Sequence, residues 1–402
     1  MSDIQSIKTS EPDVDMAIFI PAVFIVLVCA IPLMLFPDSA SQLLDYGRQV
    51  IMTNFLWLYL IVGLGAFGFC MWLAFGRFAH VKLGAPDEPP EYSDAHWVAM
   101  MFTAAIGASV LAWGFAEPIY YLQTPPLGIE IGSTKSFEWA HMYPLLHWGL
   151  VPWSIYAVPA VPIAYMLYVK RYPVLRISSA CDGALPVKGR SQAKTIIDIL
   201  IILGIVGGVT TSLGLVVPLL SAMLATLFDI DDSMLIKMSV LFLWTLLFGA
   251  SVYRGLKSGI KVLADINMAL AFFAVLFILV AGPGVFILDL TVNSIGLMFN
   301  NFISTATWTD PINNGSFPED WTGFYWAWWL AYTGMIGLFF GRISRGRTIR
   351  QLVLGVIIWG CLGTWLVLAV MGGYSLYLES TGGLNVSEIL TNQGLSLIHI
   401  SE

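Results

Sequence analysis

Nine long apolar runs constrain the fold of this chain more than any other feature of its sequence. Helices need about 20 apolar residues to cross the roughly 30 Å hydrocarbon core of a bilayer. Hydrophobic residues make up 57% of the 402 positions and charged residues only 11%, a balance far from that of soluble domains. We therefore predict an all-α polytopic membrane protein. The predicted spans begin near Met16, Phe55, Trp97, Leu145, Ile196, Met238, Ile266, Phe324 and Leu352.

The positions of Lys and Arg predict the orientation of the spans. If the N-terminus is cytoplasmic, the outer side keeps only Arg48, Lys135 and Lys237 of the 19 basic residues. Basic loops stay on the cytoplasmic side of a membrane, so we expect the N-terminus inside. The first 15 residues are polar and lead into a full-length span without a cleavage site, so we predict no removable signal peptide. These features favour a multi-pass protein of the bacterial inner (plasma) membrane.

A Pro- and acid-rich connector, GAPDEPPEYSDAHW at residues 84–97, predicts a boundary after the first two spans. A weaker amphipathic segment near residues 291–305 predicts an interfacial helix. The last eight residues, LSLIHISE, resemble translated sequencing adapter. The predicted parts are 1–83 with two spans, 97–288 with five, 289–322 with the interfacial helix and an outer loop, 323–392 with a truncated second unit of two spans, and 393–402 as a non-native tail.

Glycine and proline interrupt two spans, at residues 104–118 and 329–341. Each is the first span of its unit. In secondary transporters such paired breaks mark the substrate site, because unwound backbone can bind solutes. Alternatively, the glycines only permit close helix packing.

Motifs for enzymatic chemistry are not found in the sequence. The five histidines and four cysteines have no metal-ligand spacing, and neither a Walker motif nor a G-x-S-x-G motif occurs. The sequence therefore predicts no enzyme, no metal site and no nucleic-acid partner.

Tryptophan and tyrosine gather in two stretches, HWGLVPWSIY at residues 147–156 and FYWAWWLAYTG at residues 324–334. Such residues form belts at membrane interfaces, and Trp326 fits that role. Trp153 and Trp329, however, lie well inside their spans. Inward-facing rings suit a quaternary ammonium, which has no N–H donor and is recognised by ring faces. The candidate residues of this kind are Trp148, Trp153, Tyr156, Trp328, Trp329 and Tyr332.

Several blocks resemble the betaine/choline/carnitine transporter family. WTGFYWAWW at residues 321–329 and RISRGRTIR at residues 342–350 look like its signature. Three further blocks are similar, and the resemblance runs from about Met16 to Gly373. These blocks are HWGLVPW at residues 147–153, TSLGL at 211–215 and WGFAEPIYYLQTPPLG at 113–128.

This resemblance implies a fold of twelve spans, with two N-terminal helices before a LeuT-like five-plus-five inverted repeat. About nine of the twelve are present here. It also implies site residues: Trp148, Trp153, Tyr156, Trp328 and Trp329 match the aromatic box of the family. Tyr332 stands where some members carry another tryptophan. Trp113 and Tyr120 match aromatics that carnitine-type members use near the substrate.

The first broken helix departs from the family pattern. Sodium-coupled betaine members carry a GMGIG-like run where residues 105–109 read AIGAS, and this block looks closer to carnitine-type antiporters. Those antiporters place an arginine at Asn267, and the uncharged side chain here favours ion coupling. A sodium site would use carbonyls around Thr103 and Ile106. Na⁺ is thus a candidate coupling ion, and no other cofactor is expected.

Two charged features have alternative roles. Glu117 either touches the substrate or coupling machinery, or is a buried structural acceptor or a solvated interfacial charge. The loop ISRGRTIR at residues 343–350 is interpreted as a positive-inside anchor with conformational contacts, rather than as an anion site.

Taken together, these patterns predict a secondary transporter of a small quaternary ammonium solute that works by alternating access in a lipid bilayer. Glycine betaine, carnitine and choline remain alternatives. Other hypotheses are an ion-coupled amino-acid transporter or solute-sensing membrane protein on the same fold, and an inactive fragment. Trimers occur in the resembled family, so a homotrimer is a candidate assembly.

Overall fold

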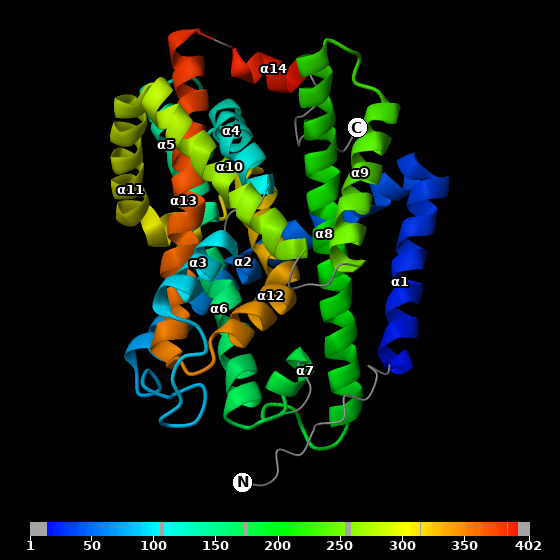
Figure 1. Cartoon of the computed structure of the whole chain (residues 1–402). Coiled ribbons are helices and arrows are strands. Elements are labelled where there is room, and N and C mark those ends of the chain that lie inside the picture. The colour runs from blue at the N-terminus through cyan, green and yellow to red at the C-terminus, as the bar shows by residue number, and fades with distance from the viewer. Residues whose placement is uncertain are drawn as a thin grey trace.

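The computed structural model describes residues 14–104, 108–172, 176–253, 259–313, 315–383 and 385–392. Helices account for nearly all of the regular structure (Figure 1). They are α1 (Met16–Leu35), α2 (Pro37–Phe75), α3 (Asp94–Ala104), α4 (Ala108–Gln123), η1 (Pro126–Gly128), α5 (Thr134–His147), α6 (Leu150–Tyr168), α7 (Ile177–Ala180), α8 (Arg190–Phe228), α9 (Met234–Tyr253), α10 (Gly259–Ala281), α11 (Gly284–Ala306), η2 (Pro318–Gly323), α12 (Phe324–Ile343), α13 (Ile349–Thr381) and α14 (Val386–Asn392).

The predicted all-α polytopic membrane fold is confirmed. Within the described ranges there is no strand. By length and composition, six segments can cross a membrane: α1, α2, α5 together with α6, α8, α11 and α13. Shorter apolar stretches lie at Met234–Ala250 and Met268–Ala281. Many side chains on α1, α8 and α9 are both apolar and exposed, as expected for surfaces that contact lipid.

All nine predicted span starts fall on helices, although the helix boundaries differ from those expected. The helix that contains Phe55 starts much earlier, at Pro37, because its first turns are polar but still helical and proline is favoured at the first helical position. The segment expected to lie at the interface forms α11, which starts at Gly284 and has 23 residues. That helix is long and apolar enough to cross a membrane. Its interfacial placement stays a prediction.

The buried core lies where α12 and α13 pack against the first unit. The most extensive helix contacts join α12 to α6, α13 to α4 and to α6, and α11 to α5. In Figure 1, α13 runs the height of the bundle beside α5, with α8 and α9 towards the opposite side. The second unit therefore covers the faces of α4 and α6 that carry the predicted aromatic residues.

One of the two predicted helix interruptions is wrong. Residues 329–341 lie within one continuous helix, α12. Its glycines are used for close packing: a Cβ on Gly337 would lie 2.7 Å from Cγ of Pro159, and one on Gly341 would lie 2.9 Å from Cγ2 of Ile163. Both neighbours belong to α6. The packing alternative is therefore the correct interpretation for this span.

The other predicted interruption includes residues 105–107, which lie outside the described residues, so it stays a prediction. A break not predicted from the sequence separates α5 from α6 at Trp148 and Gly149, where the backbone of Gly149 is not helical. A Cβ at Gly149 would lie 2.2 Å from the carbonyl oxygen of Leu145. This break sets the position of Trp148.

Segments predicted to share the inner side meet at one end of the molecule. Arg176 pairs with Asp15 at 3.0 Å, and Tyr168 donates to the carbonyl of Arg342 at 2.7 Å. Lower in Figure 1 lie the start of α1, α7 and the loop before α3. Two segments predicted to be outer also meet, through an Arg48–Asp320 ion pair of 3.0 Å. The orientation of these ends in a membrane stays a prediction.

The arginine-rich loop between α12 and α13 is bound to the connector after α2. The backbone N–H of Leu83 donates to the carbonyl of Arg347 at 2.8 Å, and Arg345 pairs with Glu88 at 2.6 Å. Hydrogen bonding from the N–H of Ala85, aided by Arg345, holds the pKa of Glu88 below its ordinary value of 4.5. The loop is thus bound to the connector, and its predicted roles as a positive-inside anchor and in conformational change stay predictions. We call residues 78–97 and 342–350 together the loop clasp.

The predicted domain boundaries remain predictions. Residues 393–402, interpreted as a non-native tail, lie outside the described residues.

Candidate functional site

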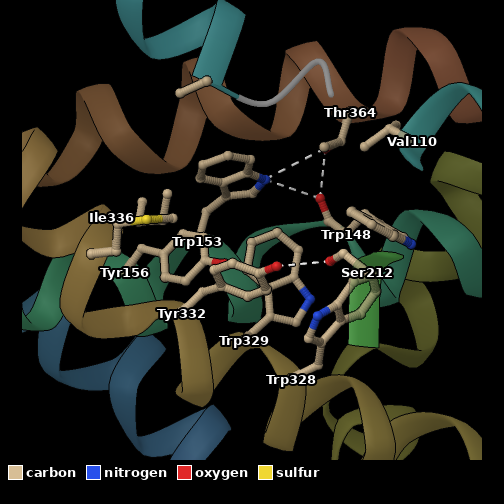
Figure 2. Close-up of a pocket in the computed structure, with 12 residues that line it drawn as sticks. Val110, Trp148, Trp153, Tyr156, Ser212, Trp328, Trp329, Tyr332, Ile336 and Thr364 are labelled. Atoms are coloured by element: carbon tan, nitrogen blue, oxygen red, sulfur yellow. Dashed lines mark hydrogen bonds between the residues drawn. The ribbon is translucent and has the colours of Figure 1, made fainter. Parts of the chain in front are cut away.

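A cavity of about 180 Å³ lies between α6, α8, α12 and α13 (Figure 2). A cavity of about 150 Å³ holds one benzene-sized molecule, so this one suits a small solute. It is lined by six of the predicted site residues: Trp148, Trp153, Tyr156, Trp328, Trp329 and Tyr332. The other lining residues are Ala104, Val110, Ser212, Met335, Ile336 and Thr364.

Trp329 is the centre of the ring arrangement. Its ring centroid lies 5.5 Å from Trp148, 5.4 Å from Trp153 and 4.7 Å from Tyr156. The planes of Trp148 and Trp329 cross at 76°, and those of Trp148 and Trp328 at 83°. Rings set nearly at right angles form the walls of a box, and we use the name aromatic box for the six predicted rings that line the cavity.

Helical spacing on α12 brings three of these rings to the cavity. Trp328 and Tyr332 are four residues apart, so they lie one turn apart on the same face, with centroids 6.4 Å apart. Trp329 is the adjacent residue and turns toward α6. Because α12 packs so closely on α6, Trp329 reaches both Trp153 and Tyr156.

Hydrogen bonds fix the orientation of two box rings. The indole N–H of Trp153 donates to the carbonyl of Trp148 at 3.1 Å, and the hydroxyl of Thr364 donates to the same carbonyl at 2.7 Å (Figure 2). Across the cavity, the hydroxyls of Ser212 and Tyr332 lie 2.7 Å apart. Pro152, four residues after Trp148, has no backbone N–H, so the Trp148 carbonyl is available to accept these two bonds.

Gly360 provides the space for Trp153. A Cβ at this position of α13 would lie 2.3 Å from Cδ2 of the Trp153 ring. Only a residue without a side chain lets the indole lie directly against the helix backbone there.

Behind the box lies a buried polar network. Glu117, fully buried, accepts hydrogen bonds from the Tyr121 hydroxyl at 2.5 Å and from the Trp148 indole at 2.9 Å. Tyr121 also contacts Nδ1 of His147 at 2.7 Å, and Nε2 of that histidine lies 3.0 Å from the hydroxyl of Thr322. Glu117 does not line the cavity. The structure therefore gives it the role of a buried acceptor that orients a box ring.

Two residues that were predicted to bind the substrate lie outside the cavity lining. Trp113 and Tyr120 do not line the cavity. Their rings pack together at 6.2 Å, and Tyr120 stacks on Trp321 at 5.9 Å. Their contribution to substrate binding stays a prediction. Trp326, expected to be an interfacial anchor, is instead fully buried and faces Gly63 of α2.

The structure describes the predicted ion site only in part. Thr103 is half-buried and donates to the carbonyl of Met100 at 3.3 Å within its own helix. Ile106 lies outside the described residues. Asn267 is in α10, but its side chain is not among those described. Among the described residues, no group of His, Cys, Asp and Glu could hold a metal ion.

Sequence reasoning missed two polar residues of the site. Ser212 lies on α8 within the TSLGL block, so its hydroxyl was an available signal. Thr364 lies on α13 in an ordinary apolar run and gave no signal. The described residues that line the cavity carry no charge, so recognition of a charged solute falls to ring faces and neutral dipoles.

The family described as "BCCT, betaine/carnitine/choline family transporter" matches residues 17–400. The chain belongs to the betaine/carnitine/choline transporter family. This BCCT protein is thus a multi-pass secondary transporter of betaine-, carnitine- or choline-type solutes, in a family of transporters rather than enzymes.

For the BCCT protein, family and fold point to the same partners, which are a lipid bilayer and a small solute.

Proposed function

We propose that this BCCT protein binds one small quaternary ammonium solute in the aromatic box and carries it across the membrane by alternating access. Glycine betaine, carnitine and choline are the candidate solutes. The observation that carries the proposal is the uncharged cavity walled by four indole and two phenol rings.

Contacts with ring faces can supply enough free energy to bind a quaternary ammonium. A desolvated cation–π contact contributes about 2 kcal/mol. Three contacts would give roughly 6 kcal/mol, which corresponds to a Kd on the order of tens of micromolar before ordering costs. Such moderate affinity suits a carrier, because the solute must also be released.

We retain the membrane, the orientation, the coupling ion and the assembly that the sequence predicts. We expect a bacterial inner membrane, a cytoplasmic N-terminus, and Na⁺ as a candidate coupling ion. A homotrimer remains the candidate assembly. Motion of α12 and α13 against α4 and α6 would expose the box alternately, because these are the helices whose contacts surround it.

Tryptophan fluorescence of the purified chain in detergent tests the proposal. Titration with glycine betaine, carnitine and choline, each with and without Na⁺, should give saturable quenching with at least one solute. In Trp329→Leu we expect the affinity to fall at least about tenfold, because one cation–π contact of about 2 kcal/mol is lost.

Trp57→Leu is the matched control. Trp57 lies on α2, is 54% exposed and does not line the cavity, so its loss removes one fluorophore without changing the box. Quenching that is equal in the two variants would place binding elsewhere. An amino-acid solute that binds better than every quaternary ammonium would favour the alternative carrier function.

A further inference from the structure

A line of hydrogen-bonded side chains runs from η2 to the wall of the aromatic box. It starts at the hydroxyl of Thr322, which lies 3.0 Å from Nε2 of His147. Nδ1 of that histidine lies 2.7 Å from the Tyr121 hydroxyl, which is 2.5 Å from Oε1 of Glu117. The line ends where Oε2 of Glu117 accepts from the indole of Trp148, a box residue. We call Glu117, Tyr121 and His147, all fully buried, the buried triad.

The tyrosine in the middle of the buried triad has one proton for two partners. In a first arrangement the Tyr121 hydroxyl donates to an ionised Glu117, and Nδ1–H of a neutral His147 donates to the tyrosine oxygen. In a second arrangement a protonated Glu117 donates to the tyrosine oxygen, and the Tyr121 hydroxyl donates to Nδ1. Nε2–H of the histidine then donates to Thr322. Both arrangements keep every hydrogen bond, and the second holds one more proton than the first.

The proton has a continuous path along these hydrogen bonds. A shift of one proton along each bond, from Glu117 to Tyr121, from Tyr121 to Nδ1 of His147 and from Nε2 to Thr322, converts the second arrangement into the first. The proton lost by the triad arrives at Thr322. That residue belongs to η2, which directly follows the loop predicted to be outer, so the proton would leave to water at that end.

Loss of the proton leaves one net negative charge on the buried triad. The ion-pair partner of Glu117 is His147 at 3.8 Å, and no lysine or arginine of the described residues pairs with it. Two phenols also face the triad: the ring centres of Tyr143 on α5 and Tyr325 on α12 lie 5.4 and 4.8 Å from that of His147. α13 and α8, which also pack on α4, add no charged group to the described contacts of the triad.

We infer that the buried triad holds one proton when the aromatic box is empty and releases it to water when a quaternary ammonium occupies the box. This inference rests on the proposed function and adds a proton to the ions that transport exchanges. A buried carboxylate without a cation is unfavourable, and either a proton or the solute cation neutralises it. An ammonium against Trp148 would lie one ring away from Glu117, where opposite charges attract strongly because the dielectric constant is low.

Calorimetry counts the protons that accompany solute binding, because the heat then depends on the ionisation enthalpy of the buffer. The full chain in detergent is titrated with glycine betaine, carnitine and choline, in two buffers over about pH 5 to 9, which includes the range where histidine titrates. We expect release of up to one proton for each solute bound. Affinity should rise with pH by up to about tenfold per unit, because the triad without its proton attracts the cation.

Two variants locate the source of the proton. Glu117→Gln removes the carboxylate but keeps an oxygen that can accept from Trp148. In this variant solute binding should release no proton, and its affinity should no longer depend on pH. Tyr121→Phe interrupts the line of hydrogen bonds between Glu117 and His147 and should also lower the number of protons released. It provides the second test if Glu117→Gln fails to fold.

His141→Gln is the matched control. His141 lies on α5, as does His147, and is fully buried. Its ring nitrogens lie 2.8 Å from the Ser294 hydroxyl and 3.0 Å from the carbonyl of Ala369, and no described carboxylate pairs with it. The number of protons released on solute binding should therefore stay as in the unchanged chain.

The outcomes separate the proton site from the proposed function. Solute binding without proton exchange at any pH, or release retained in both triad variants, would overturn the proton site and leave the aromatic box in place. Failure to bind all three solutes would overturn the proposed function. Infrared spectroscopy without solute then tests the triad alone: the bands that Glu117→Gln removes should change with pH, and bands that stay constant would overturn the proton site.

Discussion

At the scale of single residues, the position of Trp153 depends on a glycine one helix away. Gly360 of α13 faces the indole, and any Cβ there would lie 2.3 Å from it. In Gly360→Ala we expect the ring to be displaced, with a loss of roughly 1 to 3 kcal/mol from overpacking and weaker solute binding. Thermal unfolding in detergent and the fluorescence titration measure the two effects.

Gly214→Ala is the matched control. Gly214 lies on α8, and a Cβ added there would meet no atom within 4 Å. Alanine at this position should therefore be neutral or stabilise the helix by up to about 1 kcal/mol. If Gly360→Ala behaved like Gly214→Ala, the tight contact between α13 and Trp153 would not exist in solution.

The type of a residue decided whether its place in the cavity could be predicted from the sequence. Buried tryptophans in the middle of a span are rare enough to be informative, and Trp148, Trp153, Trp328 and Trp329 do line one cavity. Thr364 gave no signal because a threonine in an apolar helix usually bonds its own backbone. Its bond to the carbonyl of Trp148 depends on a segment distant in sequence.

At the scale of elements, the loop clasp ties the start of the first unit to the loop between α12 and α13. Arg347, buried, donates to Asp94 and to the carbonyl of Tyr92 at 2.9 Å. Its guanidinium also lies 4.5 Å from the ring centre of Trp97. We expect Arg347→Ala to destabilise the fold by about 2 kcal/mol, because hydrogen bonds and a cation–π contact are lost together.

Arg345→Ala supplies the comparison for the clasp. The side chain of Arg345 is 48% exposed in its pair with Glu88, and exposed ion pairs add little to stability. Thermal unfolding should therefore change much more in Arg347→Ala than in Arg345→Ala. Equal changes would mean that net positive charge, rather than the buried contacts of Arg347, stabilises this end.

The presence of the helices could be predicted from the sequence, whereas the places where helices break could be predicted only in part. Each of the nine predicted span starts lies within a helix of the structure. Glycine-rich stretches were ambiguous, because glycine serves both unwinding and close packing: Gly337 and Gly341 pack α12 against α6. The break at Gly149 could not be predicted, because one glycine between two helical segments is a weak signal.

At the scale of the whole molecule, the charged ends and the aromatic centre have separate roles. Ion pairs such as Arg176–Asp15 and Arg48–Asp320 lie at the two ends, and the aromatic cavity between helices has no charged lining residue among those described. The family match over residues 17–400 indicates the class of solute, which is of the betaine, carnitine or choline type.

Transport by this molecule, as proposed, depends on contact between ring faces of the aromatic box and the quaternary ammonium group. Saturation-transfer NMR measures this contact: aromatic protons of the purified chain are irradiated, and the signal of glycine betaine is recorded. We expect strong transfer to the N-methyl protons, and its loss in Trp329→Leu but not in Trp57→Leu. Absence of transfer, or transfer that is unchanged in Trp329→Leu, would contradict the proposed contact.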